Sequence, residues 1–309
     1  MLNENQKLDS LMALGIELNR IHDIDILLEY VLTRARQFVN ADAGSIYIRE
    51  GRHLTFAYSQ NDTLQRRRSA DEKLIYTNFS MPIDHTSIAG YAASTGKMLS
   101  IPDVYALSTG KSYRFSRKFD DASGYVTRSM LTIPLLSTKK DVLGVLQIIN
   151  AQNREKRIRP FDRGDEKVML HFASIAAVAM ERANMTRSMI LRMIRMAEMR
   201  DPKETGAHVN RVAGFSVEIY QHWARRHQID RKQIDKTRDV LRTGAMLHDV
   251  GKVSISDLIL KKPAPLSAAE FEIMKRHTIY GARLFSNPQS DYDEAAAIIA
   301  LNHHEKWDG

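Results

Sequence analysis

The chain has 309 residues, of which 43% are hydrophobic and 27% charged, and it contains no cysteine. This length favours two domains, and the composition is typical of a folded globular protein rather than a disordered or fibrous one. The lack of cysteine excludes disulfides, thiolate metal ligands and thiol nucleophiles, so any metal site must use imidazole and carboxylate groups. The sequence shows neither an apolar run of membrane-spanning length nor a secretory signal, which predicts a cytoplasmic protein.

The formal net charge of +8 suits an anionic partner such as a nucleotide or a phosphodiester. The one tight run of cations is Arg66, Arg67 and Arg68, and it has no interleaved aromatic residues. We interpret it as a solvated loop. The charge pattern therefore predicts neither a membrane nor a nucleic acid polymer as a partner.

The first part of the chain has the pattern of an α+β domain. Apolar residues repeat at helical spacing within residues 1–36, at Leu11, Leu14, Leu18 and Ile21. Two alternating segments, residues 44–50 and 53–59, flank a turn centred on glycine and predict a β-hairpin. Two more strands are expected at residues 129–135 and 142–149, around a polar turn.

Three segments of this region carry a family resemblance: TSIAGYAASTGKMLSIPDVY, FDDASGYVTRSMLTIPL and VLGVLQIIN. They resemble the signature segments of a GAF domain, and the likeness spans residues 8–183. The resemblance implies a sensor domain over residues 1–183, with a central antiparallel sheet and flanking helices. It also implies an unknown small-molecule ligand, in some relatives a cyclic nucleotide, with residues 108–128 forming pocket walls. An empty pocket is the alternative, because a fold alone does not define a ligand.

A long helix is predicted next, and residues 165–200 would connect the two domains. Its positions repeat at spacings of four and three, at Val168, Phe172, Ile175, Ala179, Arg182, Thr186, Met189, Met193 and Met196. We interpret this seam as a parallel dimer interface, which predicts a homodimer. The alternative is an amphipathic helix packed on its own domain.

From Asp201 onward the pattern is all-α, and residues 201–309 would form a second domain. Ser267 and Glu270 make a capping box that predicts the start of a helix bearing His277. Glu204 follows Asp201 and Pro202, so two interpretations of this residue are open: the partner in a helix capping box, or a metal ligand.

The chemistry of this second domain is predicted to centre on adjacent His248 and Asp249. An imidazole offers one directional nitrogen, and a carboxylate can bridge two metal ions. Lys252 follows at a spacing that places its ammonium on the same side and could protonate a leaving oxygen. Further metal-ligating types lie elsewhere in the domain, at Glu204, His208, His277, His303 and His304. Such a set suits Fe, Mn or Zn better than Mg or Ca.

Four segments in order, ETGAHVNRV, LHDVGKVSISDLILKKPAPLS, EFEIMKRH and LNHHEKWDG, resemble the HD-GYP branch of the HD phosphohydrolases. The resemblance implies a metal-dependent phosphodiesterase acting on cyclic di-GMP, with two or three ions, usually iron or manganese. It implies that Asp249 bridges the metals and that Lys252 assists the phosphodiester or its leaving group. The implied ligands are His208, His248, Asp249, His277, His303 and His304, with Glu204 as the extra ligand of trinuclear members and Asp308 as a weaker candidate.

The resemblance stops before the family's Gly-Tyr-Pro tripeptide, because the sequence ends at Gly309. We therefore expect an HD-GYP domain that is incomplete at its C-terminus, with Ile298, Ile299 and Leu301 less buried than in a complete domain and with weak or no activity. The alternative function is a catalytically inactive regulatory or interaction protein that senses a ligand through its GAF domain.

Overall fold

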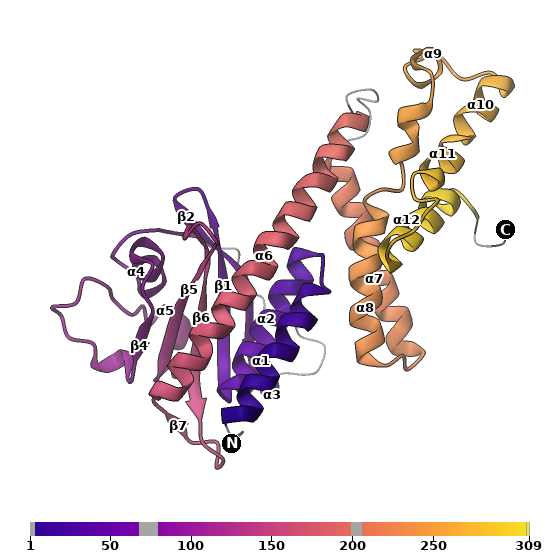
Figure 1. Ribbon diagram of the computed structural model, residues 1–309. Coiled ribbons are helices and arrows are strands. Elements are labelled where there is room, and N and C mark those ends of the chain that lie inside the picture. Colours follow the sequence, from indigo (N-terminus) through magenta and orange to yellow (C-terminus); the bar gives the residue numbers. More distant parts are fainter. Residues whose placement is uncertain (1–3, 68–79, 199–205, 307, 309) are drawn as a thin grey trace. The chain divides into compact units, whose positions relative to one another are not determined.

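The structure is a computed structural model that describes residues 4–67, 80–198, 206–306 and 308. The chain forms two compact units (Figure 1). Unit 1 comprises Met1–Arg20 and Leu27–Arg182, and unit 2 comprises Ile21–Ile26 and Ala183–Gly309. None of the helices in the described ranges has both the length and the apolar character of a membrane span.

Unit 1 is built on an antiparallel sheet, which has seven strands within the described residues. The strand order is β3-β2-β1-β6-β5-β4, with β7 paired to β6. The strands are β1 (Ala41–Glu50), β2 (His53–Asn61), β3 (Ser80–Pro82), β4 (Leu99–Ile101), β5 (Met130–Leu136), β6 (Val142–Gln152) and β7 (Ile158–Arg159). Both predicted hairpin regions are confirmed, and Gly51 in the first turn has a φ of +62°, a conformation that glycine adopts without steric cost.

The N-terminal region contains two helices where a single helical stretch was expected. They are α1 (Glu4–Asn19) and α2 (Ile24–Phe38). The Asp23 carboxylate accepts hydrogen bonds from the N–H groups of Asp25 at 3.0 Å and Ile26 at 3.1 Å. These bonds satisfy N–H groups of the first turn of α2, so Asp23 caps a new helix and ends the expected single one.

The two faces of the sheet are covered by different elements (Figure 1). One face packs against α1, α2 and the first half of α6 (Arg163–Glu198), where the rings of Phe38 and Phe172 meet edge to face at 5.7 Å. The other face lies beneath shorter elements, which are α3 (Asp62–Arg66), α4 (Ile88–Thr95), η1 (Val104–Ala106) and α5 (Lys118–Ser123). The predicted α+β fold is confirmed.

The long helix α6 confirms the predicted helix, but its seam is not uniform. Phe172 and Ala179 are buried in the core of unit 1. Met189, Met193 and Met196 are exposed by 49%, 44% and 68%. The first half of the seam therefore packs within its own domain, as the alternative interpretation had it, and only the second half presents an apolar surface.

The regular elements among the described residues of unit 2 are all helices, as predicted. Besides the second half of α6, its elements are α7 (Gly206–Arg226), α8 (Arg231–Ala245), η2 (Val250–Ser254), α9 (Asp257–Leu260), α10 (Ala268–Lys275), α11 (His277–Arg283) and α12 (Asp291–Asn302). An apolar core joins α6, α7 and the end of α8, and includes Ile190, Ile194, Val209, Ala213 and Leu247. Ile298 and Leu301 on α12 are exposed by 62% and 44%, and Ile299 is half-buried.

The predicted capping box is present at the start of α10. Ser267 Oγ accepts the N–H of Glu270 at 3.3 Å, and the Glu270 carboxylate accepts the N–H of Ser267 at 2.7 Å. The helix ends at Lys275, however, because the chain turns at Arg276. His277 is therefore the first residue of α11 rather than a residue of the capped helix.

Candidate metal centre

The two adjacent residues His248 and Asp249 lie in the turn between α8 and η2. Their neighbours Leu247 and Val250 are buried, with exposures of 2% and 8%. Burial of these two flanking side chains anchors the turn in the core of unit 2. The polar pair between them is thereby held in place, and His248 itself is only 7% exposed.

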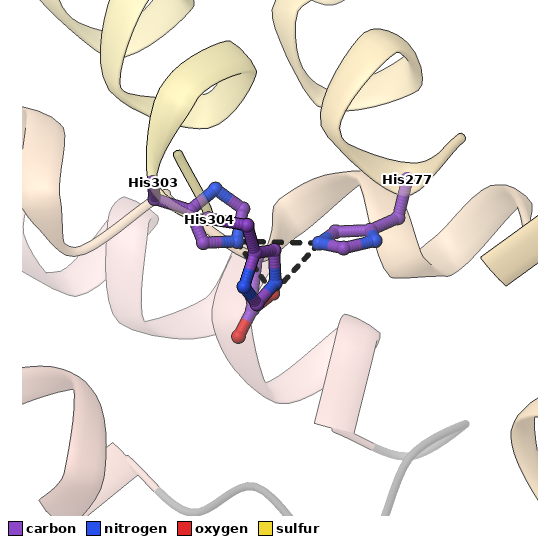
Figure 2. Close-up of side chains that lie close together, drawn as sticks. His277, His303 and His304 are labelled. Carbon is purple, nitrogen blue, oxygen red and sulfur yellow. Dashed lines mark hydrogen bonds and ion pairs between the residues drawn. The ribbon is translucent and has the colours of Figure 1, made fainter. Parts of the chain in front are cut away.

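Three more imidazoles approach Asp249 from two other helices (Figure 2). His277 begins α11, His303 is the C-cap of α12, and His304 follows it. Asp249 and these three histidines each offer one possible ligand atom, and the four atoms lie within 4.8 Å of one another. Residues far apart in the sequence thus converge on one carboxylate.

Three of the imidazoles are oriented by the same type of hydrogen bond, from Nδ1 to the backbone carbonyl three residues earlier. Nδ1 of His248 lies 2.8 Å from the carbonyl oxygen of Ala245, three positions earlier. Nδ1 of His277 lies 2.8 Å from the Met274 carbonyl, and Nδ1 of His303 lies 3.0 Å from the Ala300 carbonyl. A carbonyl can only accept, so each Nδ1 carries a proton, and Nε2 of the neutral ring keeps its lone pair.

These Nε2 atoms all face Asp249. Nε2 of His248 lies 3.0 Å from Oδ2, and Nε2 of His277 and of His303 lie 3.4 and 3.3 Å from Oδ1. The Nε2 atoms of His277 and His303 are 3.2 Å apart. Oδ1 of Asp249 is buried and has no hydrogen-bond partner.

The donor set at this site fits a divalent metal ion. Neutral imidazole nitrogens and a carboxylate oxygen are all electron-pair donors, and their convergence is unfavourable unless a cation or shared protons lie between them. A buried oxygen without a hydrogen bond calls for such a partner. Imidazole and carboxylate together suit first-row transition metals.

Opposing effects act on the pKa of Asp249. Burial alone would raise it, but protons on the ring nitrogens of His248, His277 and His303 that face the carboxylate, whose place a metal ion would take, outweigh burial and hold the pKa far below its usual range. Burial, followed by the nearby rings of His303 and His277, lowers the pKa of His304. The site therefore favours a charged carboxylate and a neutral His304, which are the protonation states that metal ligation requires.

Lys252 lies beside the same carboxylate. Its Nζ is 3.0 Å from Oδ2 of Asp249, and only 17% of each side chain is exposed. The predicted spacing of three residues thus brings the ammonium to the site, although the residue lies on the 3-10 turn η2 rather than on an α-helix. It places a proton donor next to the carboxylate.

The remaining predicted ligands are not part of this group of four residues. His208 on α7 is half-buried, and its ring centroid is 5.9 Å from that of His248. Glu204 lies outside the described residues. Asp308 is exposed.

Unit 1 contains a cavity of about 870 Å³ on the face of the sheet beneath α3, α4 and α5. Ten of its lining residues come from residues 108–128, the segment predicted to form pocket walls. Among the described residues that line it, Arg67, Arg114 and Lys118 are cations and Asp120 is the one acid, whose carboxylate accepts hydrogen bonds from Tyr105 and Thr127. Three cations against one carboxylate give these lining residues a net positive charge.

Sequence reasoning missed the polar floor of this cavity. The strand register places Ser59 opposite Ser45, and Ser45 opposite Gln147. Directly opposed residues share a face of the sheet, so the three form one polar row between apolar neighbours. Gln147 is 6% exposed, and its Nε2 donates to Thr132, 3.2 Å away. The sequence offered one signal, which is a polar residue, Gln147, at an inward-facing position of a strand. Only the strand register shows that Gln147 lies beside Ser45 and Ser59.

Comparisons with known proteins agree with this architecture. Residues 23–180 match the GAF domain model, and residues 205–309 match the HD domain model. The chain is similar to "3'3'-cGAMP-specific phosphodiesterase 2" of Vibrio cholerae, with 38% identity over 107 residues, which is 35% of this chain and 19% of that protein. It is also similar to "Cyclic di-GMP phosphodiesterase" of Thermotoga maritima, with 40% identity over 114 residues, which is 37% of this chain and 28% of that protein.

A second Vibrio cholerae protein, "Cyclic di-GMP phosphodiesterase", is 38% identical over 125 residues, which is 39% of this chain and 25% of that protein. The chain thus spans between 19% and 28% of the length of these relatives. The matches to the GAF and HD family models nevertheless define which domains this chain contains. The chain belongs to the GAF-domain family, and an HD domain follows its GAF domain.

Proposed function

We propose that the HD domain is a metal-dependent phosphodiesterase that hydrolyses cyclic di-GMP. The observation that carries this proposal is the convergence of imidazole nitrogens on the buried, unpartnered Oδ1 of Asp249. The relatives are named cyclic di-GMP and 3'3'-cGAMP phosphodiesterases, and these names favour a cyclic dinucleotide as substrate. The lack of cysteine and the net positive charge agree with a metal-based reaction on an anionic substrate.

The ligands would divide around Asp249. His208 and His248 would serve one ion, His277, His303 and His304 a second, and Asp249 would bridge them. Glu204 would add a ligand for a third ion. We infer iron or manganese, because imidazole and carboxylate groups without a thiolate suit these metals. Divalent ions would supply Lewis acidity, activating water and offsetting the charge that builds on the phosphodiester.

Lys252 would act on the leaving group. Hydrolysis adds a hydroxyl group to phosphorus, breaks one P–O bond, and requires a proton for the departing sugar oxygen. The Lys252 ammonium lies 3.0 Å from the proposed bridging carboxylate, so it is close to the reacting phosphodiester. We infer that it donates this proton and that solvent later restores it.

Metal reconstitution tests the proposed function. The chain would be stripped with a chelator, reloaded with Mn²⁺ or Fe²⁺, and assayed for cyclic di-GMP hydrolysis by chromatography. We expect the hydrolysis to be weak, as the sequence implies, and to need added metal. A chain that takes up no metal on reloading and stays inactive would instead favour a regulatory protein without catalysis.

We further propose that the GAF cavity binds a small organic anion in the cytoplasm and adjusts the HD domain. The polar row of Ser59, Ser45 and Gln147 would hydrogen-bond a polar group of the ligand, and the positive rim would attract its charge. A homodimer through α6 would connect sensor and effector.

Cyclic GMP and guanosine are matched probes for this cavity, because they share a base and differ in charge. We expect cyclic GMP to raise the unfolding temperature of the chain more than guanosine does. Gln147→Leu should remove the effect, since it deletes the hydrogen-bonding group and keeps a similar volume. Equal shifts by both probes would refute the anionic character of the ligand.

A further inference from the structure

Three glycines lie where the elements that carry the proposed metal ligands meet. Gly244 is near the end of α8, Gly251 lies in η2, and Gly281 lies in α11. None of these three has a positive φ. Their role therefore lies in the missing Cβ, which allows close approach of two backbones, and not in conformational freedom.

Gly251 lies directly against the first turn of α11. A Cβ at this position would be 1.9 Å from the carbonyl oxygen of His277 and 2.3 Å from the backbone nitrogen of Gly281. Both are backbone atoms of a helix and cannot rotate away as a side chain can. Any side chain at position 251 would thus push α11, and His277 with it, away from Asp249.

Gly281 faces α12 from the same turn. A Cβ here would be 3.1 Å from the Cβ of Ala300 and 3.4 Å from the backbone nitrogen of Gly251. Ala300 is completely buried, and its carbonyl accepts from Nδ1 of His303. The spacing between Gly281 and Ala300 therefore sets the distance between the helices that present His277 and His303.

Gly244 makes the third close approach. A Cβ on Gly244 would lie 3.0 Å from Cδ1 of Ile299 and 3.3 Å from the backbone nitrogen of Ala296. This contact joins α8, which leads into the His248–Asp249 turn, to α12. All three ligand-bearing elements are thus packed on one another at glycines.

We propose that Gly281 is a positioning residue for the metal centre. The space that it leaves between η2 and α12 keeps His277 within reach of both Asp249 and His303. This inference rests on the proposed metal-dependent function and deepens it. A methyl group at position 281 would require neighbouring atoms to give by a few tenths of an ångström. Changes in the groups that orient metal ligands typically weaken metal affinity about 10- to 100-fold.

The test compares four forms of the full chain: wild type, Gly281→Ala, Gly281→Ala with Ala300→Gly, and Gly214→Ala. Gly214 lies on α7, and a Cβ there would meet nothing within 4 Å, so it is a matched control. Mn²⁺ affinity would be measured by competition with a chelator, the Co²⁺ absorption spectrum would report ligand geometry, and the unfolding midpoint of the metal-free protein would report stability.

We expect Gly281→Ala to weaken Mn²⁺ binding about tenfold or more and to change the Co²⁺ spectrum. Its metal-free midpoint should stay close to that of wild type, and Gly214→Ala should match wild type in affinity. Ala300→Gly removes the atom that the new methyl group meets, so the double variant should regain affinity. Unchanged affinity in Gly281→Ala, or failure of this rescue, would overturn the inference while leaving the proposed function standing. A wild-type chain that binds no metal would overturn both.

Discussion

Asp249 joins two groups of imidazoles, because Oδ2 faces His248 and Oδ1 faces His277 and His303. Its low pKa keeps the carboxylate charged across the whole physiological range. A charged group of this kind, only 17% exposed at its side chain, is costly to keep buried without cations around it. The Lys252 ammonium supplies one positive charge, and metal ions would supply the rest.

Lys252 is predicted to serve the reaction rather than the binding of metal. Lys252→Met keeps the length of the stem and removes the proton donor, so we expect kcat to fall about 100-fold or more while metal content stays at the wild-type level. Lys261→Met is the control, because Lys261 is exposed and pairs with Asp257 on α9. Loss of metal from Lys252→Met would show instead that this residue maintains the site.

The capping box of α10 gives a prediction for a single element. Ser267→Ala removes the side-chain oxygen that accepts the N–H of Glu270, so unit 2 should lose about 0.5–2 kcal/mol of unfolding free energy. Ser256 precedes α9 in the same way but makes no side-chain cap bond, so Ser256→Ala should have little effect. Urea unfolding measures both, and equal losses would show that the cap bond does not stabilise the helix.

The same box predicts a pH dependence. Hydrogen bonds from Lys262 and from Ser267 lower the pKa of Glu270 to about 2 from its usual 4.5. A carboxyl whose pKa is lowered on folding adds stability above its unfolded pKa and loses it as the pH falls toward the folded value. The stability advantage of wild type over Glu270→Gln, measured in urea, should therefore be full above about pH 5 and shrink toward pH 2. An advantage that grows on acidification would contradict this.

The elements that could be predicted from the sequence have local signals. The hairpin around Gly51, the cap at Ser267 and the long helix α6 each follow from residues within one or two turns of chain. The helix break at Asp23 was not predicted, although its signal was local too. The apolar residues keep helical spacing up to this point, so their pattern does not show that Asp23 caps a second helix.

Long-range packing explains what the sequence could not predict. The polar row of Ser45 and Gln147 depends on the pairing of β1 with β6. The close approaches at Gly251 and Gly281 depend on how η2 and α11 pack, and a glycine alone does not indicate its neighbour. The proposed ligand residues could be named because four motifs occurred in order, yet the shared orientation of His248, His277 and His303 through Nδ1 came only from the structure.

We predict that two copies of the chain form a homodimer through the second half of α6. Met189 and Met193 lie on one exposed face of the helix, and burying them against a second copy would remove apolar surface from water. Met189→Lys with Met193→Lys should convert the dimer to a monomer in light-scattering measurements at the same concentration. Asn184→Lys changes an exposed position away from this face and should remain dimeric. A wild-type chain that is monomeric at every concentration would refute the interface.

The central claim is that Asp249 and its imidazoles hold metal ions that hydrolyse a cyclic dinucleotide. The most direct measurement is the metal content per chain, determined together with cyclic di-GMP hydrolysis, for wild type and Asp249→Asn after loading with Mn²⁺. Asparagine keeps the shape of the side chain and removes its charge and its bridging capacity, so a folded variant tests the carboxylate alone. The account predicts bound metal and hydrolysis in wild type and the loss of both in Asp249→Asn; an Asp249→Asn variant that binds metal and hydrolyses cyclic di-GMP as wild type does would contradict it.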